Sequence, residues 1–421
     1  PQIDEASVRR EPGVPVVNQP VRVTATILPG GNNQLTEVVI LYQLNGGEEQ
    51  IVNMERVEGD VWGGSIPGQS EGTTVWYRIR ATNSAGLTSY VPFRNWRFAY
   101  TVRPEGGLKI RDIQYRPAQW DVDYSPYRGY EVTVTGIVTT PASFAQVYGG
   151  YAIQDTADEW SGVIVRGIQD NLNVGDSIRV TGIVYERDPA NPQKWEFATY
   201  IQVSRYEVLG QATPIRPILV RGVSDLTFSR RAENLEACLV RLIDFEIDTL
   251  DGLDLATTLY WPLEDQTGDG GWMTAIGLTQ EQIRDMGLRE LRQGSRITSA
   301  IGVFTENYGH YAMALRGPQD LGPVEVREIG TPTPYRFVLH PVYPNPFNAR
   351  ASVSFDLAQS GFARLALYDL NGSLVSDLIQ ADFKAGRHTL VLDGANLPTG
   401  VYVLRLESAG GFQTRKVALV R

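Results

Sequence analysis

The chain has 421 residues, a net charge of −10 and a single cysteine, Cys238. Its length is typical of several domains, and because no run of about 18 apolar residues occurs, we expect no membrane-spanning helix. One cysteine excludes an intrachain disulfide, and the acidic balance argues against a protein that grips nucleic acid through clustered Lys and Arg side chains. The sequence starts at Pro1 without a signal peptide, so we expect a mature product or a piece of a longer chain.

Residues 1–102 predict a β-sandwich. Apolar side chains alternate with polar ones along Val21–Ile27, and strong strand formers fill Val38–Leu44 and Thr74–Ala81. Asn-Gly and Ala-Gly turns end these runs, and short strands at this spacing are typical of a sandwich. The pattern is similar to the immunoglobulin-like and fibronectin-III-like modules of secreted bacterial proteins, which implies the same fold here.

The first eight residues precede the first clear strand of this sandwich. Ile3, Ala6 and Val8 contrast with charged neighbours, as in a short edge strand. Two interpretations stay open at this point. The segment is either a frayed terminus or an arm that pairs with the sheet edge of a neighbouring subunit and links copies end to end.

The middle of the chain contains an internal duplication, which predicts two related domains at residues 107–212 and 213–323. Each copy contains a strand, a hairpin with an acidic turn, a Gly-containing turn that leads the chain back into the sheet, and a further strand. The matching segments are Tyr130–Val138 with Cys238–Phe245, Tyr151–Val165 with Leu259–Met273, and Val174–Val184 with Gln293–Val303. This order resembles the OB-fold, a five-stranded Greek-key barrel.

One clear helix is expected, from Thr279 to Leu291 in the second copy. Thr279 and Gln282 have the spacing of a capping box, and apolar residues from Ile283 onward give a rough apolar face. The helix precedes the Gly294 re-entry, where an OB-like barrel usually carries one.

Residues 324–342 are predicted to form a linker, because Thr331-Pro332-Thr333-Pro334 stiffens the chain there. The last segment, residues 343–421, predicts a small all-β sandwich. Its apolar residues alternate along Ala351–Leu357, and its strands stop at Asn-Gly, Ala-Gly or Asp-Gly turns. The expected fold class is therefore all-β and multidomain, with a sandwich, two OB-like barrels and a second sandwich in a row.

Several short motifs follow one another in the last segment. They are Tyr343-Pro344-Asn345-Pro346-Phe347, Asp369 and Gly372 of an Asp-Leu-Asn-Gly turn, Gly386 and His388, Asp393-Gly394, Gly400-Val401-Tyr402, and the basic pair Arg415-Lys416. Together they resemble the C-terminal sorting domain of proteins exported by the type IX secretion system of Bacteroidota. The segment departs from that pattern at Ser373, where an Arg often follows the turn, and at Leu392, where a Trp often precedes Asp-Gly.

This resemblance implies an immunoglobulin-like fold for residues 343–421 and export to the outer cell surface or the extracellular space. It also implies the type IX translocon and the surface attachment machinery as partners. The alternative is an ordinary immunoglobulin-like cap, since most matching residues are turn formers. The C-terminal position and the basic ending favour the signal.

No catalytic constellation is recognisable in the sequence. It lacks His-Glu-x-x-His, Gly-x-Ser-x-Gly, a phosphate-binding Gly loop and Cys-x-x-Cys. His310, His340 and His388 lie in three different contexts, so no three-histidine metal site is expected. Cys238 lies in a strand-like apolar run without a nearby His, which favours a buried side chain over a nucleophile. We therefore predict no enzymatic activity and no cofactor.

The acidic turn at residues 265–271 raises a calcium hypothesis. Asp265 and Asp269 supply the hard oxygen ligands that Ca²⁺ prefers, but the later bidentate Glu of an EF-hand is missing. A Gly-rich hairpin turn explains the same residues and is the favoured interpretation.

Aromatic residues of the first copy are candidates for ligand stacking, because OB barrels bind bases or sugars across one face. They are Tyr148, Tyr151, Trp160, Trp195, Phe197 and Tyr200. Core packing or contact between domains explains the same residues, so both interpretations stay open.

We interpret the chain as a non-catalytic structural or adhesive protein, and as a candidate subunit of an extracellular assembly or filament that self-associates through β-edges. The alternative is the accessory C-terminal region of a secreted hydrolase of the nuclease type, since tandem OB-like units follow secreted nucleases in Bacteroidota. Its OB-like domains would then bind nucleic acid or glycan. A carbohydrate-binding module is a third interpretation.

Overall fold

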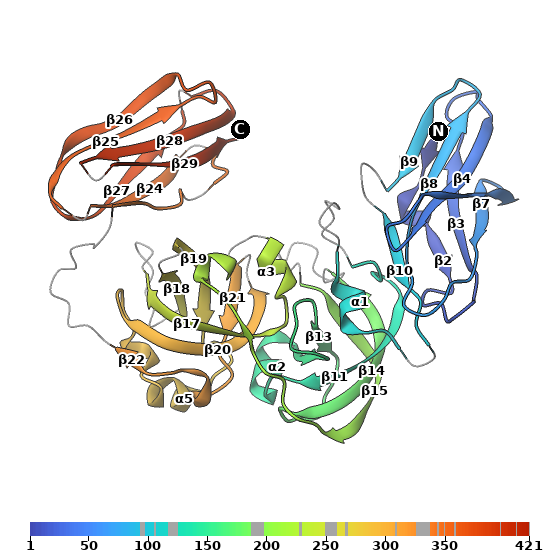
Figure 1. Ribbon diagram of the computed structural model, residues 1–421, viewed down its shortest axis with the longest axis horizontal. Helices are drawn as coiled ribbons and strands as arrows, with labels where there is room; N and C mark the ends of the chain where they lie inside the picture. The colour runs from blue at the N-terminus through green and yellow to red at the C-terminus, as the bar shows by residue number, and fades with distance from the viewer. Residues whose placement is uncertain are drawn as a thin grey trace. The chain divides into compact units, whose positions relative to one another are not determined.

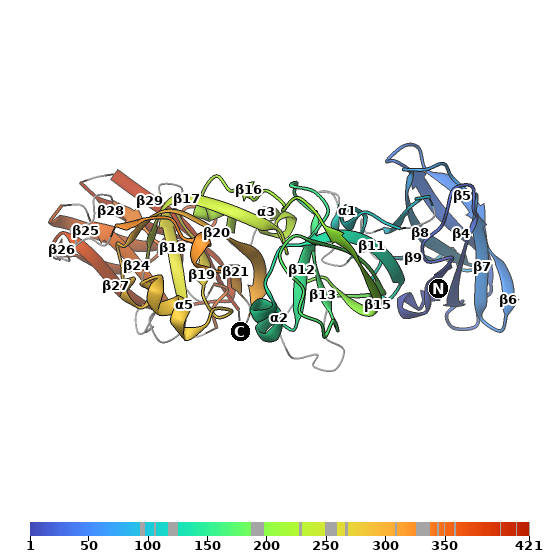
Figure 2. The ribbon, with the colours of Figure 1, turned by 90° about the horizontal axis from the view of Figure 1, so that it is seen from below.

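The computed structural model describes residues 1–92, 97–104, 107–116, 125–186, 198–226, 230–248, 259–265, 268–307, 310–325, 337–342, 345–348, 350–357, 359–395, 397–409 and 411–420. The chain divides into two compact units, Pro1–Glu325 and Val326–Arg421. Strands dominate both units (Figure 1, Figure 2), so the predicted all-β multidomain fold class is confirmed.

The first unit begins with a sandwich of two antiparallel sheets. One sheet has the order β1-β3-β7-β6 with β2 also paired to β3, and its strands are β1 (Gln2–Ile3), β2 (Arg9–Glu11), β3 (Val21–Leu28), β6 (Glu55–Glu58) and β7 (Val61–Ile66). The other has the order β10-β8-β4-β5 with β9 on β8, and its strands are β4 (Leu35–Leu44), β5 (Gln50–Asn53), β8 (Thr74–Asn83), β9 (Thr88–Val91) and β10 (Phe98–Thr101). Alternation along β3 buries Val21, Val23, Ala25 and Ile27 between the sheets, as the sequence pattern predicts.

The first residues belong to this sandwich. Gln2 and Ile3 of β1 pair with the end of β3, and the Ser89 hydroxyl donates to the carbonyl oxygen of Pro1 at 2.6 Å. A short 3-10 turn (Glu5–Ser7), capped by Asp4, then leads into β2. The segment is thus neither the frayed terminus nor the free arm that the sequence suggested, because it is paired within its own chain.

A closed five-stranded barrel follows the sandwich. Its strands are β11 (Glu131–Val138), β12 (Gly150–Gln154), β13 (Gly162–Arg166), β14 (Asp176–Tyr185) and β15 (Tyr200–Gln211), in the closed order β11-β12-β13-β15-β14. The third and fifth strands run parallel, and the first strand pairs with the fourth, which gives the predicted OB-like barrel. Helix α1 (Ile110–Gln114) precedes the barrel and α2 (Ala142–Tyr148) lies between its first two strands.

The second barrel repeats this strand order. It consists of β17 (Leu239–Ile247), β18 (Tyr260–Asp265), β19 (Gly268–Thr274), β20 (Arg296–Asn307) and β21 (His310–Ala314), and the β17–β20 pairing closes it. Strands β16 (Ile218–Leu219) and β22 (Val324–Glu325), the 3-10 turns η2 (Val223–Leu226) and η4 (Pro318–Asp320), and helix α3 (Arg230–Asn234) flank it. The segments matched by the internal duplication fall on equivalent strands of the two barrels.

The expected helix of the second barrel is present but shorter than predicted. It is α5 (Gln280–Asp285), and both bonds of the capping box form, since Gln282 N donates to Thr279 Oγ1 at 3.2 Å and Thr279 N donates to Gln282 Oε1 at 2.8 Å. Gly287 then adopts a left-handed φ of 64°, which ends the helix, and a separate 3-10 turn, η3 (Leu288–Glu290), follows.

The second unit is a sandwich of a three-stranded and a four-stranded sheet. The strands β23 (Val338–Leu339), β24 (Arg350–Leu357) and β27 (Gly386–Asp393) form the first sheet in the order β23-β24-β27. The strands β25 (Gly361–Tyr368), β26 (Leu374–Phe383), β28 (Gly400–Ser408) and β29 (Gly411–Leu419) form the second in the order β26-β25-β28-β29. Strand β23 lies inside the segment expected to be linker, because backbone pairing with β24 extends the sandwich toward the N-terminus.

Candidate functional site

The predicted sorting signal begins with residues that attach to the last strand. The Asn345 side chain donates from Nδ2 to the Lys416 carbonyl at 2.9 Å and accepts from the Ala418 amide at 2.8 Å. The Phe347 amide donates to the Ala418 carbonyl at 2.8 Å, and the Phe347 ring is 1% exposed in the core. The Asn-Pro-Phe motif, with Pro346 in the middle, therefore fixes the entry of the chain against β29. Two other predicted signal residues, Tyr343 and Pro344, lie outside the described residues.

Asp369 and Gly372 form a turn of the signal. Asp369 Oδ1 accepts from the amides of Asn371 and Ser373, each at 2.8 Å. Gly372 adopts a φ of 84°, a conformation that glycine tolerates without strain. Because Ser373 serves the turn through its backbone amide, its departure from the family pattern leaves the turn intact.

The other signal residues also shape the sandwich. A Cβ on Gly394 would lie 2.9 Å from the Phe347 ring and 3.0 Å from Leu419, so a larger residue there would displace these two core side chains. The Tyr402 hydroxyl donates to the Pro398 carbonyl at 2.5 Å. The remaining predicted residues are Gly386, His388 and Asp393 on β27, Gly400 and Val401 on β28, and Arg415 and Lys416 on β29. Recognition of these residues by the export machinery stays a prediction.

This unit also contains a polar triad of His340, Asp356 and Arg387 that the sequence analysis did not predict. His340 Nε2 lies 2.8 Å from Asp356 Oδ2, and the Arg387 guanidinium donates to both Asp356 oxygens at 2.8 and 3.0 Å. Burial raises the pKa of Asp356, but hydrogen bonds from His340 and Arg387 outweigh it and bring that pKa to about 2. The triad ties the segment that follows β23 to β24 and β27.

Four of the aromatic residues considered for ligand stacking are described. Tyr151, Trp160 and Tyr200 are 2%, 6% and 5% exposed, and half-buried Tyr148 stacks on Phe144 with ring centroids 4.2 Å apart. Their burial favours packing, and ligand stacking by these residues stays a prediction. The other two aromatic candidates, Trp195 and Phe197, lie outside the described residues.

The acidic turn of the second barrel has a structural contact. Asp265 Oδ2 accepts from the Val223 amide at 3.0 Å, so this carboxylate binds the start of η2. The side chain of Asp269 lies outside the described residues. Within the described ranges, no three His, Cys, Asp or Glu side chains are gathered in a way that suits a metal ion. Calcium binding stays a prediction.

Arg10 joins the sandwich to the first barrel. Arg10 lies on β2 and is 4% exposed. Its guanidinium donates to the carbonyls of Gly13 at 2.9 Å, Ala99 at 2.6 Å and Pro126 at 3.0 Å. Its guanidinium carbon also lies 4.1 Å from the centroid of the Tyr130 ring at the start of the barrel. One continuous apolar core runs through the sandwich and this barrel.

The two barrels share an apolar interface. Along β12 and β13, Tyr151, Ile153, Val163 and Val165 point into the first barrel, so the residues between them point outward. Those outward residues meet the second barrel in a separate buried cluster. The cluster contains Phe144, Ala152, Ile164 and Tyr200 of the first barrel with Ala237, Leu239, Val303 and Ala314 of the second.

The edges of this interface are polar and tight. Gln154 Oε1 accepts from the Leu239 amide at 2.7 Å. A Cβ on Gly162 would lie 2.3 Å from the Ala237 carbonyl carbon, so the two backbones touch there. The adjacent Cys238 is fully buried, as the sequence predicts, and burial raises the pKa of its thiol to about 12.

A buried acidic cluster lies beside the interface. Glu186, at the end of β14, and Glu236, before β17, are 2% and 4% exposed, and Arg116 ion-pairs with Glu186 and with Glu233 of α3. Thr199 connects them, since its hydroxyl donates to Glu186 at 3.0 Å and its amide donates to Glu236 at 2.8 Å. Burial raises the pKa of Glu186 to about 7, and burial with the neighbouring carboxylates raises the pKa of Glu236.

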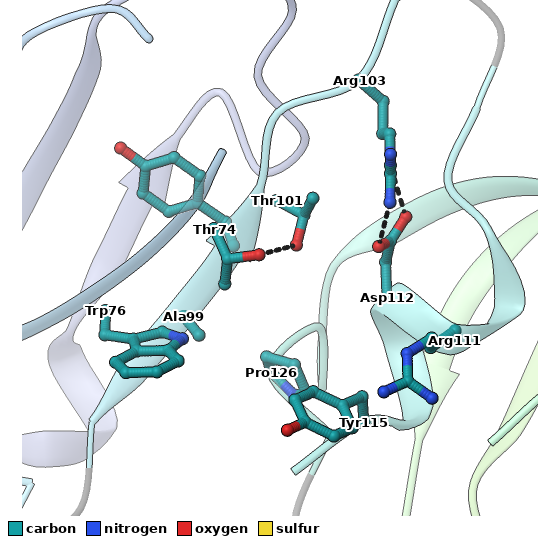
Figure 3. Close-up of a pocket in the computed structure, with 10 residues that line it drawn as sticks. Thr74, Trp76, Ala99, Thr101, Arg103, Arg111, Asp112, Tyr115 and Pro126 are labelled. Atoms are coloured by element: carbon teal, nitrogen blue, oxygen red, sulfur yellow. Dashed lines mark hydrogen bonds and ion pairs between the residues drawn. The ribbon is translucent and has the colours of Figure 1, made fainter. Parts of the chain in front are cut away.

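A cavity of about 200 Å³ lies between the sandwich and α1 (Figure 3). Strands β8 and β10 line one side, and α1 with the residue after it lines the other. The lining residues include Trp76, Thr74 and Thr101 from the sandwich and Arg111 and Tyr115 from the α1 segment. The cavity could not be predicted from the sequence, because its two sides are formed by segments that are separate in the chain, the strands of the sandwich and the α1 segment.

Residues 341–420 match the family of secretion system C-terminal sorting domains. The second unit is therefore a sorting domain, as the motifs predicted. The chain is a cargo protein of the type IX secretion system and is located at the cell surface or outside the cell.

No curated protein matches the sequence. Among the helices of the described residues, none has the length and apolarity to cross a membrane.

Solved structures give only distant similarity. An uncharacterised protein from Listeria monocytogenes, in complex with glucose, magnesium and calcium, is 8% identical with a TM-score of 0.20, over 86% of this chain and 22% of that one. The cycloalternan-forming enzyme of Listeria monocytogenes is 10% identical with a TM-score of 0.21, over the same shares. Dimeric latent PorU from Porphyromonas gingivalis is 10% identical with a TM-score of 0.20, over 97% of this chain and 32% of that one. This chain spans about a fifth of the length of the first two, and at such scores their ligands and activities do not transfer to it.

Proposed function

We propose that this exported cargo protein is a non-catalytic structural or adhesive component of the cell surface. The observation that carries the proposal is that the chain itself covers the usual ligand face of the first barrel and part of that face in the second. OB-fold proteins bind oligonucleotides and oligosaccharides on the face of their second and third strands. In these two barrels that face is formed by β12 with β13 and by β18 with β19.

In the first barrel this face is the interface with the second barrel. Ala152 and Ile164 point outward from β12 and β13 and are 0% and 4% exposed. Gln154 and Gly162, at the ends of the same strands, contact Leu239 and Ala237. A nucleic acid or glycan strand has no access to this face without separating the barrels.

In the second barrel η2 covers part of the corresponding face. A Cβ on Gly271 of β19 would lie 2.6 Å from Leu226 Cβ and 2.8 Å from the Leu226 carbonyl oxygen. The Val223 amide is hydrogen-bonded to Asp265 at the end of β18. These contacts support a structural role for the barrels and count against the nucleic-acid-binding alternative.

Self-association through β-edges is a further part of the proposal. In the N-terminal sandwich β5 is an edge strand, and its Ile51 is 59% exposed, whereas the edge strand β6 carries Glu55, Arg56 and Glu58. Charged residues on an edge oppose pairing, so β5 is the better candidate. Light scattering of the purified chain and of an Ile51→Lys variant tests this, and equal monomer masses at all concentrations would exclude the edge.

The proposal is tested with protein recovered from the surface of the native cells. We expect intact mass spectrometry to show a polypeptide without an additional catalytic domain, and the purified chain to leave DNA, RNA and polysaccharide uncleaved. A longer native polypeptide with a hydrolase domain would favour the accessory alternative. Deleting residues 337–421 should strand the first unit in the periplasm, since the sorting domain then is lost as a whole.

A further inference from the structure

The cavity between the sandwich and α1 has two aromatic walls. Trp76, half-buried on β8, lies on the sandwich side, and Tyr115, 39% exposed, lies on the α1 side (Figure 3). Aromatic faces of this kind bind planar groups and the C–H faces of sugar rings. A cavity of about 200 Å³ is smaller than the roughly 300–1,000 Å³ of sites for drug-sized ligands, so it suits one ring rather than a longer segment.

The cavity also carries a positive charge. Arg103 is neutralised by Asp112, to which it donates two hydrogen bonds at 2.8 and 2.7 Å. Arg111 lies over the Tyr115 ring, 4.4 Å from its centroid, and donates to the Glu159 carbonyl at 3.5 Å. Within the described ranges no carboxylate lies at ion-pair distance from it. The positive charge of Arg111 is thus not neutralised by a described carboxylate and can attract an anion, although the chain as a whole has a net charge of −10.

Hydroxyl groups lie near the aromatic and cationic groups. Thr74 Oγ1 and Thr101 Oγ1 are 3.1 Å apart on the neighbouring strands β8 and β10, and both residues line the cavity (Figure 3). A hydroxyl both donates and accepts, so this pair matches the hydroxyls of a sugar. A guanidinium binds a carboxylate through two parallel hydrogen bonds.

We propose that this cavity binds one acidic sugar residue of an extracellular polysaccharide, with its carboxylate on Arg111 and its ring against the aromatic side chains that line the cavity. The inference deepens the adhesive function proposed above and rests on it for its biological setting. A carboxyl-bearing peptide shares the anion but lacks the ring and the hydroxyls, so the sugar is the ligand that uses all the groups present.

The test is isothermal titration of the purified full chain with a galacturonic acid trisaccharide, and with a galactose trisaccharide as the neutral probe. We expect the acidic probe to bind at least tenfold more tightly, with an affinity that falls as salt is added. Arg111→Gln should remove this preference, and Tyr115→Ala should weaken binding of the acidic probe by about tenfold or more. Arg179→Gln, a change of an exposed arginine on β14, is the matched control and should leave binding unchanged.

Equal affinity for the two sugars, an unchanged preference in Arg111→Gln, or no binding of the acidic probe at millimolar concentration would overturn the inference. Tighter binding of triglutamate than of the acidic sugar would do the same. Far-ultraviolet circular dichroism confirms that each variant is folded. Because binding is measured on the purified chain, its failure leaves the structural role standing, whereas a catalytic domain on the native polypeptide would contradict the proposed function itself.

Discussion

The buried carboxyl of Glu186 should make the stability of the first unit fall as the pH rises. Burial raises its pKa from the ordinary 4.5 to about 7 in the folded chain. Between these two values the folded state holds a proton that the unfolded state has released. The contribution of this bound proton to the free energy of unfolding is therefore fully present below pH 4.5 and is lost as the pH rises through 7.

The size of this effect follows from the shift. One pKa unit corresponds to about 1.4 kcal/mol, so the free energy of unfolding should drop by about 3 kcal/mol between pH 4.5 and pH 8 through Glu186. Glu186→Gln keeps the shape of the protonated acid, because its amide oxygen accepts from the Ser125 amide. Its NH₂ group, like the O–H of the acid, lies beside the Arg116 guanidinium and faces the Thr199 hydroxyl, which can accept from it. The variant should match the parent near pH 4.5 and be more stable by up to about 3 kcal/mol at pH 8.

Tryptophan fluorescence during urea denaturation measures this free energy in the intact chain. All eight tryptophans lie before residue 326, so the signal reports on the first unit alone. Glu131→Gln, at an exposed position of β11, is the control and should leave the pH dependence of the parent unchanged. If Glu186→Gln shows the same pH dependence as the parent, the carboxyl is ionised in the fold and the reasoning fails.

Three further predictions concern the junctions and the sorting domain. Gly162→Ala should lower the denaturation midpoint of the first unit sharply, because its Cβ would overlap the Ala237 backbone, whereas Gly361→Ala meets nothing within 4 Å and should change the second unit little. Arg10→Met should cost the first unit about 3 kcal/mol in urea denaturation, since three carbonyls lose their donor. Asp356→Asn should destabilise the second unit by about 2 kcal/mol at pH 7, measured by hydrogen exchange of residues 337–420. That contribution is present above pH 3.8 and lost as the pH falls through about 2, so a difference that persists at pH 1.5 would contradict it.

The strands and turns could be predicted from the sequence because their signals are local. The alternation along β3 and the capping box of Thr279 involve residues that are close together in the sequence. Each segment of the internal duplication is likewise a short run of consecutive residues. The sorting signal was recognisable for the same reason, since Asp369 and Gly372 act within one turn.

The junctions between modules could not be predicted, because their partners are far apart in the chain. Arg10 is one of two adjacent arginines near the N-terminus, and only the fold shows that it is buried against Tyr130. Glu186 and Glu236 read as ordinary surface carboxylates until Thr199 brings them together. Sequence periodicity reports which face of a strand is buried, and it does not report which other module covers that face.

The covered ligand face also bears on where a ligand of this protein can bind. Separating the barrels would expose the buried apolar cluster around Ala152 and Ile164 and would break the hydrogen bond between Gln154 and the Leu239 amide. Exposure of several apolar side chains and one lost buried bond costs several kcal/mol. A ligand that binds this face of the first barrel would bind only to the state in which the barrels are separated. The free energy needed to separate them would therefore be subtracted from its binding free energy. The cavity lined by Trp76 and Arg111 needs no such opening, so the acidic sugar that we propose as its ligand would not have to separate the barrels.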